Sequence, residues 1–165
     1  MRHALITRDG LARLTEELDR LTTSGRQTIA ERIRTAVSTD ANVAENADYH
    51  HAREEQALLE RRIAVLRAQI AAAEPVDPDA ANGTVDIGER VRLRELRTGR
   101  TLEYTVVGSL EADPLARRIS AASPLGKALL GRPRGAVVTA KTPKGRRRFE
   151  ILAIEVPVGA DEAVR

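Results

Sequence analysis

The sequence lacks cysteine and tryptophan altogether, and its 165 residues include only three aromatic side chains, Tyr49, Tyr104 and Phe149. The absence of cysteine excludes disulfides and thiol catalysis. With so few aromatics the core must be aliphatic. No apolar run approaches the roughly 18 residues that a membrane span needs, and residues 1–9 lack the apolar stretch of a signal peptide. We therefore expect a cytoplasmic protein without membrane contact.

Charge is abundant but unevenly distributed along the chain. Residues 1–73 carry 11 basic and 11 acidic side chains, whereas residues 84–156 carry 15 basic and 8 acidic ones, a net charge of +7. A basic segment is most often a solvated face, but it also raises the chance of an anionic partner. The two halves therefore differ electrostatically.

Two long helical patterns occupy the first half. After Thr7, a plausible N-cap, leucines recur at spacings of three and four. Gly25 interrupts this register, and an apolar face then continues as far as Val37. The second pattern is a regular heptad seam. Its members are Tyr49, Ala52, Gln56, Leu59, Ile63, Leu66, Ile70 and Ala73. Two such helices joined by a short bend near residues 39–45 predict an antiparallel coiled-coil hairpin.

The segment "EPVDPDAANG" (74–83) contains two prolines and an Asn-Gly pair, so it ends the helix and begins a linker. Beyond it, alternating apolar and polar residues around Thr98-Gly99 and around "TPKG" predict two β-hairpins. A short helix ending at Gly131 lies between them. We predict an α+β protein with a coiled-coil hairpin (1–75), a linker (76–83), a small antiparallel β domain (84–157) and a tail (158–165).

The bend "ANVAENADYHHAREEQ" (41–56) gathers acids beside an asparagine. One interpretation is helix capping, in which Asp40 or Asn42 caps the second helix and Glu45 closes a capping-box-like arrangement. The other is an exposed acidic tip, formed by Asp40, Asn42, Glu45 and Asp48, that offers oxygen ligands to a metal ion or a basic pocket. The pattern alone favours capping, because short motifs have high false-positive rates.

No complete active site is apparent in the sequence. His50 and His51 are adjacent, so on a helix they point about 100° apart, which disfavours zinc binding. No catalytic triad or phosphate-binding loop is present, and we expect no intrinsic catalytic residue and no bound cofactor or metal. The arginines at 146–148 are interpreted as a solvated strand edge, with nucleic-acid contact as the minority alternative.

Four stretches together resemble the bacterial Gre transcription factors over about residues 6–156. They are "ITRDGLARLTEEL", "ENADYHHAREEQ", "SPLGKALLG" and "AKTPKGRRRFEI". The resemblance implies an FKBP-like globular domain that docks at the rim coiled coil of the RNA polymerase secondary channel. It also implies that the helical hairpin reaches down this channel.

In the family, an Asp and a Glu three residues apart at the tip help to hold a Mg²⁺ ion of the polymerase. The polymerase then hydrolyses its own backtracked transcript. The resemblance aligns Glu45 with the family's Glu, but Asn42 occupies the position of the Asp. Replacing a carboxylate by an amide removes one full charge from the ligands of a hard cation. A basic residue of the family tip is also missing, since Ala44 stands in its place.

Other positions keep the family pattern. Arg53 matches an arginine that can face the phosphates of the nascent RNA, although a helix-surface arginine is equally compatible with a structural role. Ser123, Pro124 and Leu125 match the loop that grips the polymerase rim, although Ala122 replaces the usual Asn or Asp before it.

We therefore predict a monomeric, non-enzymatic regulator that binds RNA polymerase and inhibits transcription more than it stimulates cleavage. The alternative within the family is an active cleavage factor that uses Asp40 or Asp48 together with Glu45. Outside the family, the alternatives are a DNA- or RNA-binding module acting through the basic half, a coiled-coil adaptor, or a proline isomerase.

Overall fold

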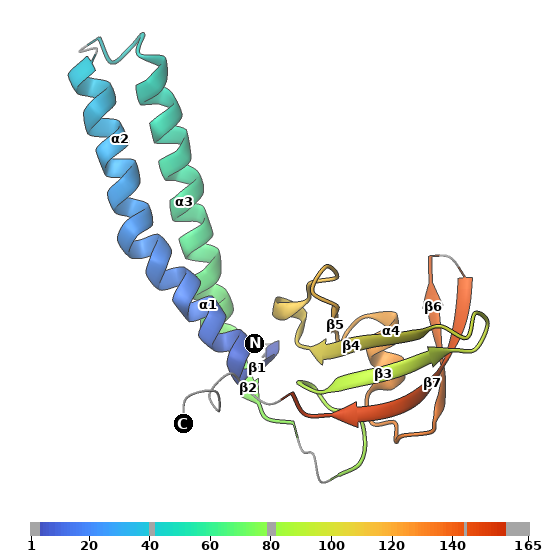
Figure 1. Cartoon of the computed structure of the whole chain (residues 1–165). Helices are drawn as coiled ribbons and strands as arrows, with labels where there is room; N and C mark the ends of the chain where they lie inside the picture. Colours follow the sequence, from blue (N-terminus) through green and yellow to red (C-terminus); the bar gives the residue numbers. More distant parts are fainter. Residues whose placement is uncertain (1–3, 40–41, 79–81, 144, 158–165) are drawn as a thin grey trace, which may run out of the picture. The chain divides into compact units, whose positions relative to one another are not determined.

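The computed structural model describes residues 4–39, 42–78, 82–143 and 145–157. It divides the chain into two compact units. One is the helical segment 12–72, and the other combines residues 1–11 with residues 73–165. The α+β class is confirmed, with the helices and the strands shown in Figure 1.

The helical unit is a hairpin of two long rods (Figure 1). Its first rod consists of α1 (Arg8–Arg20), a π-helical turn η1 (Leu21–Gly25) and α2 (Arg26–Thr39), and its second rod is α3 (Ala47–Ala72). Three ion pairs join the rods: Glu17–Arg62, Arg26–Glu60 and Arg32–Glu55. From one pair to the next, the residue number in the first rod rises while the residue number in α3 falls. The rods are therefore antiparallel, as predicted.

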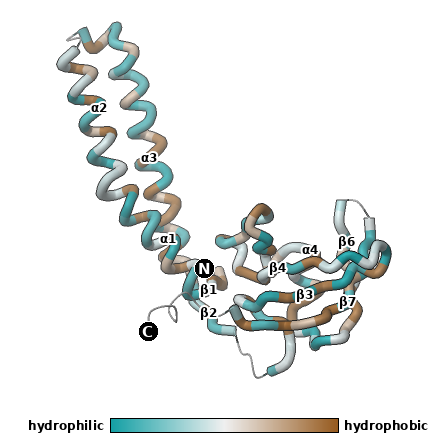
Figure 2. Tube along the Cα trace, viewed as in Figure 1, coloured by the Kyte–Doolittle hydropathy of each residue, from teal (hydrophilic) through white to brown (hydrophobic). Residues whose placement is uncertain are grey.

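The heptad seam forms the interface between the rods from Tyr49 to Ile70, whereas Ala73, its last predicted member, is the first residue of strand β2 (Ala73–Val76). Ala36, Ala52, Ile63 and Leu66 are buried, whereas the residues between them are mostly exposed. Figure 2 shows hydrophobic segments at intervals along the helices, separated by hydrophilic ones. This is the pattern of an amphipathic helix pair. Among the described residues, no helix has the length and apolarity to cross a membrane.

The interruption predicted at Gly25 takes the form of the π-helical turn. Within it, the hydroxyls of Thr22, Thr23 and Ser24 donate to backbone carbonyls four residues earlier, at 2.7–3.0 Å. A π-helical turn inserts extra backbone into the helix. The apolar stripe is therefore realigned, so that α2 continues along α3 without a break in the rod.

The other unit contains a five-stranded sheet of order β5-β4-β3-β7-β6. The strands are β3 (Arg90–Glu95), β4 (Thr101–Val107), β5 (Arg118–Ser120), β6 (Val137–Thr142) and β7 (Gly145–Glu155). The two predicted hairpins are β3–β4 and β6–β7. The sheet is not wholly antiparallel, because β5 adds one parallel pairing with β4 that the sequence did not predict.

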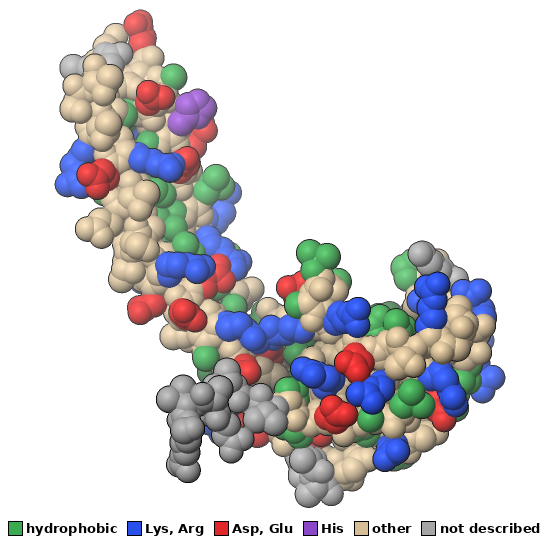
Figure 3. Space-filling view, viewed as in Figure 1, with side chains coloured by type: hydrophobic (Ala, Val, Ile, Leu, Met, Phe, Trp, Pro, Cys, Tyr) green, Lys and Arg blue, Asp and Glu red, His purple; other side chains and the backbone are tan. Residues whose placement is uncertain are grey.

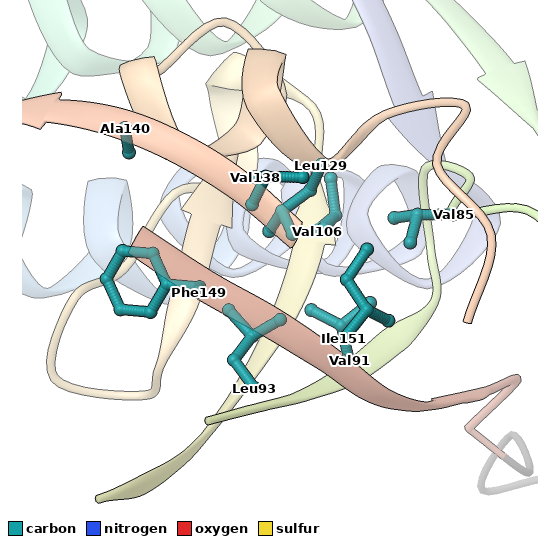
Figure 4. Packing of buried hydrophobic residues seen from close by; sticks show 9 residues of the cluster. All are labelled: Val85, Val91, Leu93, Val106, Leu129, Val138, Ala140, Phe149 and Ile151. Atoms are coloured by element: carbon teal, nitrogen blue, oxygen red, sulfur yellow. The ribbon is translucent and has the colours of Figure 1, made fainter. Parts of the chain in front are cut away.

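The buried core cluster of this unit is aliphatic apart from the ring of Phe149 (Figure 4), and half-buried Tyr104 packs against it. Alternation along β3 buries Val91 and Leu93, which pack with Phe149 and Ile151 of β7. Helix α4 (Pro124–Leu129) contributes Leu129 to the same cluster. Gly131 has a φ of 70° just after this helix, the left-handed conformation that favours glycine at a helix end.

A second, two-stranded sheet pairs β1 (Ala4–Thr7) with β2 (Ala73–Val76) in parallel. Glu111, at the end of the short 3₁₀ helix η2 (Ser109–Glu111), is buried beside it. Its carboxylate accepts hydrogen bonds from the amide and hydroxyl of Thr7 at 2.8 and 2.5 Å, and it pairs with Arg118 at 2.8 Å. Strand β1 is therefore anchored in the sheet unit through Thr7.

Candidate functional site

The tip of the helical hairpin is the segment between Thr39 and Ala47, of which residues 42–46 are described. Its backbone turns at Asn42, whose carbonyl accepts from the amide of Glu45 at 3.1 Å. The side chains of the same two residues also meet, because Asn42 Nδ2 donates to Glu45 Oε2 at 3.2 Å. An amide and a carboxylate therefore stand together at the tip.

The N-cap of α3 is Asn46, so the capping role predicted for Asp40 or Asn42 is wrong. The Oδ1 atom of Asn46 accepts from the amide of Tyr49 at 2.9 Å, the usual bond between an N-cap and the third helical residue. Its Nδ2 donates to the carbonyl of Ala36 at 2.8 Å. Asn46, unlike exposed Asn42, is buried and bonds to both rods, and α3 begins directly after it, next to the bend predicted near residues 39–45.

The exposed acids lie on either side of this buried cap. Glu45 and Asp48 are both exposed, and Asp48 is in the first turn of α3, where a negative charge favours the positive helix end. The predicted site residue Asp40 lies outside the described residues. Acidic side chains are also visible at the end of the hairpin in Figure 3.

His50 supports the tip loop from the first turn of α3. Its Nε2 lies 3.2 Å from the carbonyl of Ala44, and its ring makes an edge contact with Tyr49 at 5.7 Å between centroids. His51 instead lies 3.9 Å from Glu54. Within the described part of the chain, no group of three or more acidic, histidine or cysteine side chains is arranged to hold a metal ion.

Sequence reasoning missed the parts played by Asn46 and His50. An asparagine directly before a periodic helical segment is a recognised start signal, and it was available at Asn46. The contact of His50 with Ala44 had no sequence signal, because it depends on how the loop folds back over the helix.

Arg53 and the predicted docking loop have local partners. The Nη1 atom of Arg53 donates to Gln56 Oε1 at 2.6 Å, and the side chain is exposed. Ser123 is the N-cap of α4, since its Oγ accepts from the amide of Gly126 at 3.0 Å. Pro124 follows as the first helical residue, and Leu125 packs partly buried against the core. These contacts give each of the four residues a structural role and leave Arg53 and Pro124 accessible.

Comparison with known proteins supports the interpretation of the tip as part of a transcription factor. Residues 4–74 match the family model described as the N-terminal part of a transcription elongation factor, and residues 80–156 match the GreA/GreB C-terminal model.

The chain is 42% identical over 151 residues to the transcription elongation factor GreA of Clostridioides difficile, covering 91% of this chain and 94% of that one. It is 44% identical over 150 residues to GreA of Chloroflexus aurantiacus, covering 90% and 95%. Among solved structures, the GreA factor homolog 1 of Thermus thermophilus is 30% identical over 93% of this chain and 99% of that chain, with a TM-score of 0.42.

Proposed function

This chain belongs to the GreA/GreB family of transcription elongation factors, and we propose that it binds RNA polymerase, occupies the secondary channel and restrains transcription. In this proposal it is a cytoplasmic, monomeric accessory factor. Any hydrolysis of RNA would take place in the active site of the polymerase, and the Mg²⁺ ion of the polymerase would supply the metal-ion catalysis.

The bond between Asn42 and Glu45 is the observation that carries this proposal. A carboxylate at position 42 would add a second anionic oxygen at the tip, whereas the amide presents an N–H group to Glu45 at 3.2 Å. The amide of Asn42 therefore occupies one carboxylate oxygen of Glu45. This arrangement does not fit a divalent cation that prefers several anionic oxygens.

The length and narrow form of the hairpin support the proposed occupancy of the channel. Its second rod has 26 helical residues, which span about 39 Å at 1.5 Å per residue. Arg53 is exposed, one to two helical turns from the tip, and is proposed to contact the phosphates of nascent RNA. Ser123, Pro124 and Leu125 are proposed to contact the rim coiled coil of the polymerase. A factor of this kind obstructs nucleotide entry and excludes other channel-binding proteins.

The proposal is tested with a stalled, backtracked elongation complex in which transcript shortening is followed on a gel. The wild-type protein should slow nucleotide addition while adding little cleavage. Asn42→Asp, alone or combined with Ala41→Gly, should increase cleavage at least about tenfold, because a charge-assisted ligand contributes about 1.5–3 kcal/mol. Strong Mg²⁺-dependent cleavage by the wild-type protein would overturn the inhibitory assignment.

Gln27→Glu is the matched control. It adds the same charge to an exposed position of the same hairpin, on α2 away from the tip. It should leave cleavage unchanged. A gain as large as that of Asn42→Asp would mean that net charge, and not the ligand position, controls the reaction.

An active cleavage factor is the second candidate, favoured by the exposure of Asp48 three residues after Glu45. This candidate applies if the wild-type protein stimulates cleavage. In that case, loss of cleavage in Asp48→Asn would show that Asp48 supplies the second carboxylate. Retention of cleavage in Asp48→Asn would assign the role to Asp40.

A further inference from the structure

The outer face of the five-stranded sheet carries a concentration of arginine and lysine. Since Val91, Leu93 and Glu95 point into the core, Arg90, Arg92 and Arg94 of β3 point to the opposite side. The strand register adds Arg146, Arg148 and Lys141 of β7 and β6 to the same face. In Figure 3, blue side chains lie along the sheet and gather near the end formed by β6 and β7.

The acids on this face are already engaged. Glu103 and Glu155 lie 2.8 and 3.9 Å from Arg92, and Glu150 pairs with Arg94. Among the described residues, no carboxylate forms an ion pair with the other cations of this face, which are Arg90, Lys141, Arg146, Arg148 and the neighbouring Arg117. These five charges remain available to an external anion.

Two of the five border a small polar hollow of about 160 Å³. Arg90, Arg117 and Thr105 line it, together with Glu103, Tyr104 and Ala116. Arg117 has a φ of 55° and is the one non-glycine residue with positive φ in the described part of the chain. This conformation costs a β-carbon-bearing residue about 1–2 kcal/mol, and such strain is typically retained where a side chain has a function.

The remaining three cations lie at the far end of the same face. Glu95 of β3 is opposite Phe149 of the antiparallel strand β7. Five steps along β3 from Arg90 to Glu95 and three along β7 from Phe149 to Arg146 therefore separate Arg90 from Arg146 by eight residues along the strand axis. At 3.3 Å per residue this is about 26 Å. A small anion can contact the cations at only one end of this face, whereas a chain of phosphates can contact the cations at both ends.

We propose that this sheet face binds the phosphate backbone of duplex nucleic acid. The register places Tyr104 opposite buried Val91, and Phe149 is itself buried, so neither ring lies on the outer face to stack an unpaired base. Contact is therefore with phosphates, without sequence selectivity. This inference is independent of the hairpin tip and of polymerase binding.

The test is fluorescence anisotropy of a labelled 20-base-pair DNA duplex titrated with the full chain between 50 and 200 mM KCl. Five phosphate contacts predict a slope of about −4.5 for the logarithm of affinity against the logarithm of salt. Affinity should then fall about 500-fold across this range. Absence of binding at 50 mM, or a slope near zero, overturns the proposal and leaves an acidic protein surface as the partner of this face.

Variants at each end of the face locate the contact. Arg146→Ala with Arg148→Ala should reduce the slope to about −2.7 and the salt effect to about 40-fold. Arg117→Gly should reduce the slope to about −3.6 and the loss of affinity between 50 and 200 mM KCl to about 150-fold. It should also raise thermal stability, because glycine adopts positive φ without strain. If Arg117→Gly binds DNA more weakly than the wild type while being more stable, misfolding is excluded as the cause of the weaker binding.

Arg61→Ala is the matched control, because it removes one exposed arginine from α3 of the helical unit. Its slope should equal that of the wild type. If Arg61→Ala weakens binding as much as Arg117→Gly does, the attraction depends on net charge alone and the sheet face is not the site.

Discussion

At the scale of single residues, two asparagines at the hairpin tip make different kinds of contact. Asn42 is exposed and bonds to the side chain of Glu45. Asn46 is buried and joins the start of α3 to the last turns of α2 through Tyr49 and Ala36. The first therefore affects the chemistry that the tip presents, and the second affects the stability of the bend.

Asn46→Ala should lower the free energy of unfolding by about 2–3 kcal/mol. It removes an N-cap, worth about 0.5–2 kcal/mol, and leaves the carbonyl of Ala36 without its donor, which adds a desolvation penalty. Urea unfolding measures the change. Asn46→Asp keeps the capping acceptor and should lie between wild type and alanine, while exposed Asn42→Ala should change stability by less than about 0.5 kcal/mol. Equal effects at positions 42 and 46 would contradict this assignment.

Glu95 is a buried acid with two strong partners. Its carboxylate accepts from Arg147 Nε and from Thr98 Oγ1, each at 2.6 Å. The hydrogen bond from Arg147, followed by that from Thr98, lowers the pKa of Glu95 from 4.5 to about 2. Arg147 also lies 5.6 Å from the centroid of the Phe149 ring, so its guanidinium is held on the core.

This lowered pKa predicts a particular pH dependence of stability. Because Glu95 is ionised more readily in the folded chain than in the unfolded chain, its contribution is complete above about pH 4.5 and is lost as the pH falls toward 2. Thermal unfolding of Glu95→Gln should show a lower midpoint than wild type at pH 6, and the difference should shrink between pH 4.5 and 2. Glu103→Gln, at a half-exposed site, is the control with a small effect. Parallel curves for wild type and Glu95→Gln would rule out this source of acid sensitivity.

At the scale of elements, helix α4 sits so close to β5 that its third residue must be glycine. A β-carbon at Gly126 would lie 2.1 Å from the carbonyl oxygen of Ser120 and 2.9 Å from Cα of Ala121. Both are backbone atoms, so the contact cannot be relieved by rotating a side chain.

Gly126→Ala should therefore destabilise the chain by about 1–3 kcal/mol or more, as overpacking of a core does, even though alanine favours helix formation. The urea midpoint is the measurement. Lys127→Ala, the next residue and exposed, should change stability by less than about 0.5 kcal/mol. If Gly126→Ala is neutral or stabilising, α4 does not approach β5 as closely as described.

At the scale of the whole molecule, the sheet unit is discontinuous in sequence. Its first strand, β1, precedes the helical hairpin, while its partner β2 follows it. Ile6 is fully buried, whereas the adjacent Leu5 is 42% exposed. The hairpin is thus an insertion between two paired strands.

Ile6→Ala should lower the free energy of unfolding by about 2–4 kcal/mol, the usual effect of truncating a buried isoleucine. Hydrogen exchange followed by mass spectrometry should show the loss of protection in β1, β2 and η2, with the middle of α3 unchanged. Leu5→Ala should cost much less. Equal deprotection of the helices would indicate that the two units unfold together.

The sequence alone determined the elements whose signals are periodic and local. The heptad seam of α3, the N-cap at Thr7, the hairpins at Thr98-Gly99 and "TPKG", and the helix after Ser123 all follow from spacing and turn chemistry. The motifs also carried family membership, because they resemble that family over nearly the whole chain. That an asparagine stands at position 42 of the tip is likewise read directly from the sequence.

Only the tertiary structure decided which groups meet across long stretches of chain. The pairing of β1 with β2, the anchoring of Thr7 by Glu111 and the parallel pairing of β5 join residues whose separation leaves no local signal. Asn46 had a local helix-start signal, but only the packed chain brings its Nδ2 atom to the carbonyl of Ala36 on the other rod. Many residues of the chain could chemically form each of these hydrogen bonds or pairings. Which residue does so depends on long-range contacts and burial, which exist only in the packed chain.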